Sequence, residues 1–264
     1  MSVRPKKRLG QHFLADEAVV QAIAESVRPP AGSRLVEIGP GEGVLTAELL
    51  RRDVGLVAIE VDPEAVAHLR ARFPHLDLRE ADVLNVDWGA LRMEGGPGAA
   101  PLTVVGNLPY YITSPILFSL LAARAHVGRA TVMVQREVGD RLVAPHGSKT
   151  YGTLSVYFQL FARTRHLFDV PRHAFRPPPA VESAVVEVDF GVEAPDVPFA
   201  ALQRVVKAAF GQRRKMFRNS VAPLFAEAGR EMPAWAATLR PEAVTPADFV
   251  MLAQALVGHA EPAV

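Results

Sequence analysis

Short apolar runs alternate with longer segments of helical spacing through the first two thirds of the chain. Four of the apolar runs are too short for helices and have the continuous pattern of strands buried on both faces. They span residues 34–38, 54–60, 102–106 and 130–135. Helices are predicted at residues 17–27, 44–52, 63–72 and 114–124. This alternation predicts a doubly wound α/β domain, in which helices cover both faces of a parallel sheet.

A change of pattern near residue 192 divides the chain. A predicted strand at residues 184–190 is followed by residues 191–198, which are rich in turn formers. From Phe199 onward the apolar spacing is helical. We therefore expect one domain over residues 1–192 and a small all-helical C-terminal domain over residues 193–264.

The composition is that of an ordinary globular protein, and it excludes several kinds of site. Of 264 residues, 49% are hydrophobic and 22% are charged, and none is cysteine. Disulfides, thiolate zinc sites and cysteine nucleophiles are therefore excluded, and the lack of cysteine fits a reducing cytoplasm. The histidines include no pair at i and i+4, so no metal site is predicted. Nowhere do about 18 apolar residues run together, so we expect neither a signal peptide nor a membrane span.

The first predicted strand leads into a glycine-rich loop. Gly39, Gly41 and Gly43 follow the strand and precede a predicted helix, an arrangement that lets backbone approach a nucleotide closely. The spacing differs from the dinucleotide fingerprint, because the third glycine comes two residues after the second and Glu42 lies inside the loop. Such a loop would bind pyrophosphate poorly. We expect the three glycines to bind a nucleoside cofactor that carries no phosphate.

Two carboxylates follow the next two predicted strands. Glu60 ends the second strand, at the distance where a carboxylate accepts hydrogen bonds from ribose hydroxyls. Asp82 ends a further strand, between residues 60 and 102, where it can accept a hydrogen bond from an adenine amino group. Together with the loop, these residues suit S-adenosylmethionine. The alternative is a structural turn, with Asp82 only capping a helix and Glu60 only solvated.

A candidate catalytic tetrapeptide ends the strand at residues 102–106. It consists of Asn107, Leu108, Pro109 and Tyr110, at the edge where open α/β sheets bind their ligands. Methylation of an adenine amino group needs acceptors for both N–H bonds, because the nitrogen lone pair is delocalised into the ring. The Asn107 side-chain oxygen and the Leu108 carbonyl suit this role, while Pro109 turns the chain and Tyr110 offers a ring to the base. The alternative is a Pro-Tyr turn in which Asn107 caps the next helix.

The glycine loop, the two carboxylates and the tetrapeptide, with further segments along nearly the whole chain, resemble those of the KsgA-type small-subunit ribosomal RNA adenine N6,N6-dimethyltransferases. That family shares its fold with the erythromycin-resistance rRNA methylases and the mitochondrial transcription factor B proteins. The matching segments are residues 7–14, 37–46, 59–62, 80–83, 107–111, 151–156, 175–183 and 210–215. The resemblance implies a Rossmann-like class I methyltransferase sheet with S-adenosylmethionine as cofactor. It also implies a monomer that dimethylates two adjacent adenines in a hairpin loop near the 3′ end of 16S rRNA.

The resemblance further implies roles for individual residues. Cofactor contacts are implied for His12, Leu14, Gly39, Glu60, Asp82 and Asn107. Phe175 would stack on an adenine flipped out of its RNA context, although an aromatic residue taken alone is more often part of a core. His12 is a departure from the family pattern, because many relatives carry Asn there, and either side chain can hydrogen-bond the cofactor.

Basic residues gather near both ends of the chain. One set is Lys6, Lys7 and Arg8, and the other is Arg213, Arg214, Lys215 and Arg218. Residues 197–226 hold six basic residues and no acidic residue. This charge favours a helix that contacts phosphates over a helix whose basic face is only solvated. The resemblance makes small-subunit rRNA the partner, either free or within a pre-assembled small subunit.

Two other functions fit the same fold. One is a large-subunit rRNA adenine methylase of the resistance type, which shares the Asn-x-Pro-Tyr motif but typically differs around residues 10–11 and 212–215. The other is a ribosome-assembly or transcription factor that binds RNA without turnover. A damaged glycine loop or tetrapeptide would mark such a factor, and both are intact here. We therefore expect the small-subunit enzyme, with a role in ribosome biogenesis.

Overall fold

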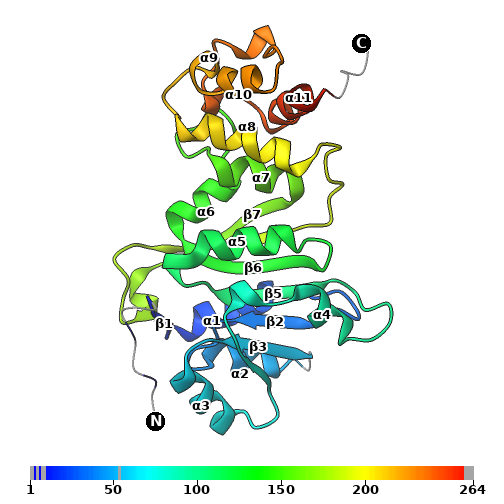
Figure 1. Ribbon diagram of the computed structural model, residues 1–264. Helices are drawn as coiled ribbons and strands as arrows, with labels where there is room; N and C mark the ends of the chain where they lie inside the picture. The colour runs from blue at the N-terminus through cyan, green and yellow to red at the C-terminus, as the bar shows by residue number, and fades with distance from the viewer. Residues whose placement is uncertain (1–2, 4–5, 7–9, 53–54, 259–264) are drawn as a thin grey trace. The chain divides into compact units, whose positions relative to one another are not determined.

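The chain divides into two compact units. The computed structural model describes residues 3, 6, 10–52 and 55–258, and Figure 1 shows their helices and strands. The first unit is made of Met1–Gly139 and Thr164–Gly191, and the second of Asp140–Arg163 and Val192–Val264.

The first unit is built on a seven-stranded sheet. Its strands are β2 (Leu35–Ile38), β3 (Leu56–Glu60), β4 (Asp77–Glu80), β5 (Leu102–Asn107), β6 (Val127–Gln135), β7 (Arg163–Val170) and β9 (Ser183–Asp189). They lie in the order β4-β3-β2-β5-β6-β9-β7. The strands from β4 to β6 are parallel, whereas β9 is antiparallel to β6. The predicted doubly wound α/β fold is confirmed.

The two edge strands of this sheet differ from its centre. The inner strand β3 is buried along its whole length, whereas most residues of β4 and β7 are half-buried or exposed. No continuous apolar run therefore marks these two strands in the sequence. The expectation that Asp82 ends a strand is wrong by two residues, because β4 ends at Glu80 and Asp82 begins a 3-10 turn (Val83–Asn85).

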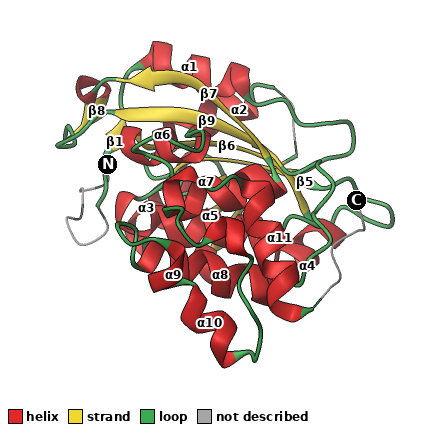
Figure 2. Ribbon diagram, turned by 90° about the horizontal axis from the view of Figure 1, so that it is seen from above, coloured by secondary structure: helices red, strands yellow, loops and turns green. Residues whose placement is uncertain are grey.

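Helices pack on both faces of the sheet. They are α1 (Glu17–Ser26), α2 (Val44–Leu50), α3 (Pro63–Arg72), α4 (Trp88–Met93), α5 (Thr113–Ala122) and α6 (Arg136–Val143). Figure 2 shows α1 and α2 on one face and α5 on the other. Asp16 and Asp62 begin α1 and α3, because the side chain of each accepts hydrogen bonds from backbone N–H groups of the first turn. Ile23 of α1 and Leu49 of α2 join the strand residue Val105 in the core.

A second, two-stranded sheet joins segments that are far apart in the sequence. Its strands are β1 (Phe13–Leu14) and β8 (Phe175–Arg176), which are antiparallel and place Leu14 opposite Phe175. Two residues are too few to show a strand pattern, so the sequence does not predict this pairing. It brings the N-terminal segment beside the proline-rich residues 177–179.

The second unit is built mainly of helices in its described residues, and it includes the end of α6 from Asp140. Its helices are α7 (Thr153–Phe161), α8 (Phe199–Gly211), α9 (Phe217–Ser220), α10 (Ala222–Glu227) and α11 (Pro246–Val257). This unit includes residues 140–163, which the expected domain boundary at residue 192 assigns to the first domain. The physical reason is aromatic packing, because Tyr157 and Phe161 of α7 contact the ring of Phe199 on α8 at centroid distances of 5.7 and 5.8 Å. In the described part of the chain, no helix is long and apolar enough to cross a membrane.

One prediction concerns Gly106 of β5, which is paired with Ile38 of β2. A β-carbon at this position would lie 2.5 Å from the Ile38 carbonyl oxygen and 3.2 Å from the Ile38 β-carbon. Gly106→Ala should therefore lower the free energy of unfolding in urea by about 1–3 kcal/mol, as overpacking does. Gly55→Ala is the matched control at the start of β3, because its β-carbon would meet nothing within 4 Å. Equal stability of the two variants would contradict this account.

Candidate active site

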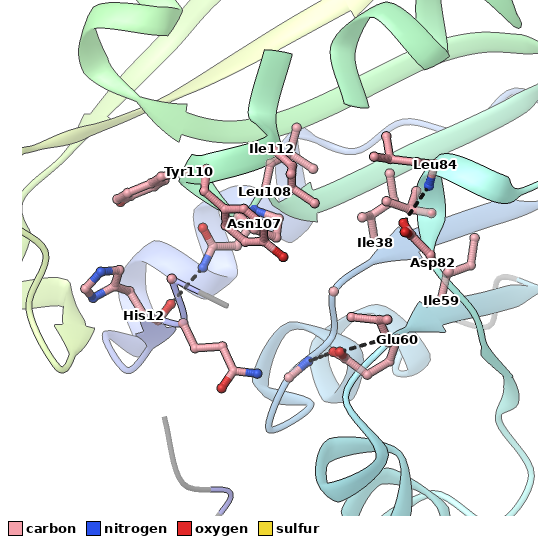
Figure 3. A pocket seen from close by; sticks show the side chains of 18 of the residues that line it. His12, Ile38, Ile59, Glu60, Asp82, Leu84, Asn107, Leu108, Tyr110 and Ile112 are labelled. Atoms are coloured by element: carbon pink, nitrogen blue, oxygen red, sulfur yellow. Dashed lines mark hydrogen bonds between the residues drawn. The ribbon is translucent and has the colours of Figure 1, made fainter. Parts of the chain in front are cut away.

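The carboxyl ends of β2, β3 and β5 surround a cavity of about 230 Å³. Parallel strands end at one edge of a sheet, so the loops that follow them meet there. The N-terminal residues 10–13 add a further wall. Figure 3 shows the predicted site residues Asn107, Leu108 and Tyr110 beside the cavity, with Glu60 and Asp82 across from them.

The glycine loop after β2 adopts a backbone conformation that side chains rarely tolerate. Gly39, Gly41 and Gly43 have φ values of 65°, 57° and 75°. A β-carbon at Gly41 would lie 2.9 Å from the ring of Phe13, and one at Gly43 would lie 2.6 Å from the ring of Phe73. Gly39 and Gly41 line the cavity, whereas Gly43 begins α2 and is not among the lining residues. The prediction that Gly43 touches the cofactor gains no support from this position.

Glu60 is held rigidly at the end of β3. Its carboxylate accepts backbone N–H bonds from Gly41 at 3.1 Å and from Val61 and Asp62 at 2.9 Å each. Burial raises the pKa of Glu60, and these three hydrogen bonds oppose that effect. The residue is 6% exposed, so the alternative of a merely solvated carboxylate is wrong. A carboxylate has about four acceptor positions, so Glu60 can accept a further hydrogen bond from a ligand.

Asp82 both caps a turn and lines the cavity. One of its oxygens accepts the Leu84 N–H at 2.9 Å, as the capping alternative requires. The side chain also belongs to the cavity wall, beside Val83 and Leu84. The two functions are compatible, because the second carboxylate oxygen takes no part in the cap.

Asn107 is the polar residue at the centre of the wall formed by β5. Its side-chain N–H donates to the His12 carbonyl at 2.9 Å, as the dashed line in Figure 3 shows. A carbonyl can only accept, so this bond fixes which end of the carboxamide is the nitrogen. The Asn107 oxygen therefore faces away from His12 and is free to accept from a ligand.

The three residues after Asn107 are anchored in different ways. The Leu108 side chain is buried, and its N–H donates to the Met133 carbonyl at 3.0 Å. The Pro109 carbonyl accepts a hydrogen bond at 2.9 Å from the hydroxyl of Thr113, the first residue of α5. The Tyr110 hydroxyl lies 2.6 Å from the Ser183 hydroxyl, and its ring stacks on that of His12. Leu108, Pro109 and Tyr110 all line the cavity.

Leu14 and Phe175 lie behind the cavity wall instead of in it. Phe175 is 2% exposed and is paired with Leu14 through the β1–β8 sheet. Neither is among the residues lining the main cavity, and Leu14 lines a smaller cavity of about 40 Å³ beside it. Stacking of Phe175 on a base therefore requires the side chain to move, and it stays a prediction.

Comparison with known proteins assigns the chain to a family. The family model described as "Ribosomal RNA adenine dimethylase" matches residues 3–248. The chain belongs to this family. A relative from Salinibacter ruber, named "Ribosomal RNA small subunit methyltransferase A", is 45% identical over 261 residues, covering 98% of this chain and 87% of the relative.

Two solved structures are similar over almost the whole chain. One is a dimethyladenosine transferase from Plasmodium falciparum, with a TM-score of 0.74, 21% identity, and coverage of 91% of this chain and 96% of the other. The other is the 23S rRNA methyltransferase ErmE, with a TM-score of 0.62, 27% identity, and coverage of 93% and 99%. The Rossmann-like class I methyltransferase fold expected from the sequence is thereby confirmed.

S-adenosylmethionine is the cofactor of this family, and the cavity fits it. The glycine loop leaves room where β-carbons would fill the wall, and Glu60 ends a strand at the place where ribose hydroxyls are bound. The described lining residues include the carboxylates of Glu60 and Asp82 and neither lysine nor arginine. A pyrophosphate would be repelled by this wall, whereas a cofactor with a sulfonium charge would be attracted.

Glu37 is a residue that sequence reasoning missed. It lies in β2 with 1% of its surface exposed and accepts the Thr46 hydroxyl hydrogen at 2.7 Å. Burial, partly opposed by this hydrogen bond, raises the pKa of Glu37 to about 7. It lines the smaller cavity with Leu14 and Asn107. Its signal in the sequence is an acid inside an otherwise apolar strand.

Lys6 is placed differently from the prediction that it binds RNA. Its ammonium group pairs with the carboxylates of Asp62 and Glu64, and the Gln11 side chain donates to the other oxygen of Asp62 at 3.0 Å. Desolvation would raise the pKa of Asp62, but the hydrogen bonds from Lys6 and Gln11 hold it below its ordinary value. Lys6 thus fastens the N-terminal segment to the start of α3. The predicted RNA-binding residues Lys7 and Arg8 lie outside the described residues.

The basic residues of the second unit do not all lie on one helix. Helix α8 ends at Gly211, so Arg213, Arg214 and Lys215 lie in the turn before α9, which holds Arg218. Arg213 donates to the Lys149 carbonyl and its Nε lies 4.0 Å from a carboxylate oxygen of Glu242. Arg214, Lys215 and Arg218 are exposed. Within the described residues, no three His, Cys, Asp or Glu side chains gather as they would around a metal ion.

A second prediction concerns the stability of the protein as a function of pH. The folded-state pKa of Glu37, about 7, lies above the ordinary value of 4.5, so its contribution is fully present below about pH 4.5 and is lost as the pH rises through 7. The loss is on the order of 3 kcal/mol. Glu37→Gln cannot ionise, so its free energy of unfolding should fall less than that of the wild type between pH 5 and 8. Parallel curves for the two proteins, measured in urea, would contradict a protonated Glu37.

Proposed function

We propose that this protein transfers methyl groups from S-adenosylmethionine to the N6 amino groups of two adjacent adenines in a hairpin loop near the 3′ end of small-subunit rRNA. The observation that supports this most directly is the fixed carboxamide of Asn107. Its N–H is taken by the His12 carbonyl, so its oxygen remains as an acceptor beside the cofactor cavity. An N–H of an adenine amino group is the donor that such an acceptor would bind.

The proposed mechanism relies on positioning and electrostatics. The bound cofactor supplies an electrophilic methyl group on a positively charged sulfur. The Asn107 oxygen and the Leu108 carbonyl accept hydrogen bonds from the two N–H groups of the adenine N6. These two bonds withdraw the nitrogen lone pair from the ring and direct it at the methyl carbon. Transfer of the methyl group that the cofactor would supply would form an N–C bond at N6 and leave the sulfur as a neutral thioether. The nitrogen then carries a positive charge and loses one proton to water, so the reaction needs no strong base.

Tyr110 supports the base and does not act as a proton acceptor. Burial raises the pKa of Tyr110, partly opposed by the hydrogen bond from Ser183, so its hydroxyl stays neutral at physiological pH. The hydrogen bond to Ser183 fixes the ring at the carboxyl end of β5. A fixed ring at this place suits stacking against an adenine.

The relatives support the small subunit as the source of the RNA. The Salinibacter ruber protein, whose name specifies the small subunit, is 45% identical to this chain. The structure of ErmE, whose name specifies 23S rRNA, is 27% identical. The intact glycine loop and tetrapeptide argue against a factor that binds RNA without turnover. We further propose that the protein acts as a monomer in the cytoplasm.

The experiment that tests this proposal is methyl transfer from radiolabelled S-adenosylmethionine. Unmodified small ribosomal subunits, their naked rRNA and large-subunit RNA should be compared side by side. We expect dimethyladenosine at two adjacent positions in the small-subunit RNA and none in the large-subunit RNA. Label confined to large-subunit RNA would support the resistance-type alternative, and no label at all would support the factor without turnover.

A third prediction concerns Asn107. Asn107→Ala removes the acceptor for the amino group, so methyl transfer should fall by about 10² or more. RNA affinity should stay within about twofold, because Asn107 contacts no phosphate in this proposal. Asn107→Asp is the matched variant, and it should also be inactive because a carboxylate cannot donate to the His12 carbonyl. RNA affinity that falls along with activity would contradict this role.

A fourth prediction separates the basic residues of the turn after α8. Arg214→Ala combined with Lys215→Ala should weaken RNA binding and reduce the slope of log affinity against log salt by roughly one to two, because each phosphate contact contributes about one. Arg213→Ala is the matched control. It is tied to Lys149 and Glu242, so its loss should lower the stability of the second unit more than it changes the salt slope. An unchanged salt slope in the double variant would show that Arg214 and Lys215 are solvated side chains that contact no phosphate.

A further inference from the structure

His12 makes three contacts that all involve residues on the proposed base-binding side of the site. Its imidazole Nδ1 lies 2.8 Å from the Pro177 carbonyl oxygen. Its ring stacks on that of Tyr110, with centroids 5.6 Å apart and planes at 28°. Its backbone carbonyl accepts the side-chain N–H of Asn107. One residue therefore touches two members of the tetrapeptide and the proline-rich segment.

The contact with Pro177 determines where the imidazole carries its hydrogen. A proline carbonyl can only accept, so Nδ1 must be the donor. In the neutral ring this leaves Nε2 without a hydrogen. The ring orientation is thus fixed by two independent contacts, a hydrogen bond at one edge and the Tyr110 ring against its face.

Pro177 directly follows the strand that carries Phe175. The β1–β8 sheet already pairs Phe13 with Arg176 and Leu14 with Phe175, and the His12 side chain extends this connection by one residue on each strand. Figure 3 shows the His12 ring next to Tyr110, on the side of the site away from Glu60 and Asp82. The His12 side chain therefore contacts Tyr110 and the segment that follows Phe175.

We infer that His12 is a positioning residue for the adenine substrate, and that its ring holds Tyr110 and the Phe175–Pro177 segment in place. This inference rests on the proposed function and differs from the cofactor contact that the family resemblance implies for this position. The common property of His and Asn is an N–H donor at the δ position. An Asn at position 12 can thus make the bond to the Pro177 carbonyl without the ring.

Three variants test this inference. His12→Ala loses both the donor and the ring, His12→Phe keeps a ring without a donor, and His12→Asn keeps a donor without a ring. In His12→Ala and His12→Phe the KM for RNA should rise by about threefold to tenfold, the effect of one lost hydrogen bond. His12→Asn should restore this KM to within about twofold of the wild type. The dissociation constant for S-adenosylmethionine, measured by calorimetry without RNA, should stay within about twofold in all three.

The opposite pattern would overturn the inference. If His12→Ala weakens S-adenosylmethionine binding and leaves the KM for RNA unchanged, His12 serves the cofactor, as the resemblance implies. If His12→Asn fails to restore the KM, or His12→Phe behaves like the wild type, the bond to Pro177 is not what positions the substrate side. Circular dichroism melting of each variant shows whether a loss of folding underlies any change.

A measurement without substrate distinguishes failure of this inference from failure of the proposed function. Nitrogen-15 NMR of the histidine rings in the wild-type protein should show His12 with its hydrogen on Nδ1. Assignment would come from the missing signals in His12→Asn. A hydrogen on Nε2 alone would refute the contact with Pro177, whatever RNA the protein modifies. An inactive wild-type protein that shows the Nδ1–H form would instead count against the proposed function alone.

Discussion

The hydrogen bond from the Asn107 side chain to the His12 carbonyl is the interaction on which the arrangement of the site depends. Asn107 ends β5 in the centre of the sheet, and His12 precedes β1 in the N-terminal segment. The bond orients the carboxamide, so that its oxygen faces a ligand. It also places residues 10–13 over the glycine loop, where the Phe13 ring occupies the space that only a glycine at position 41 leaves open. A glycine with positive φ at this point therefore serves the N-terminal wall as well as the cofactor.

The charges around the cavity follow from burial at strand ends. Burial raises the pKa of both buried acids, but three backbone N–H bonds oppose that rise at Glu60, whereas Glu37 has a single hydroxyl donor and a pKa raised to about 7. Asp62 stays ionised because Lys6 and Gln11 bind it. The described lining of the main cavity holds the acids Glu60 and Asp82 and neither lysine nor arginine. Such a lining favours a cationic cofactor and disfavours a phosphate-bearing one.

The sequence predicts the central strands and the residues at their carboxyl ends, because strands buried on both faces leave continuous apolar runs. It places the end of β4 two residues too late and does not predict β7, because these edge strands are half-buried or exposed and leave no continuous apolar run. The pairing of β1 with β8 escapes any local pattern, since it depends on contacts between distant segments. For the same reason, the sequence predicts Lys6 and Arg213 as RNA-binding residues and does not show their ion-pair partners, Asp62 and Glu242. Residues 140–163 join the second unit through aromatic contacts that spacing alone does not show.

The cofactor cavity and the tetrapeptide explain the reaction, but they do not explain the choice of RNA. A relative that is 45% identical is named for the small subunit, whereas a structure that shares this fold with a TM-score of 0.62 is named for 23S rRNA, so the fold alone does not select the RNA. Selection must come from groups that touch the RNA outside the reacting base. In the proposed function, the exposed basic residues after α8 would attract phosphates, and such attraction by itself carries little sequence information. Under the inference drawn for His12, discrimination between adenines would then fall to the segment around Phe175 and Pro177. A small change at His12 would in that case alter substrate choice while leaving the methyl donor bound.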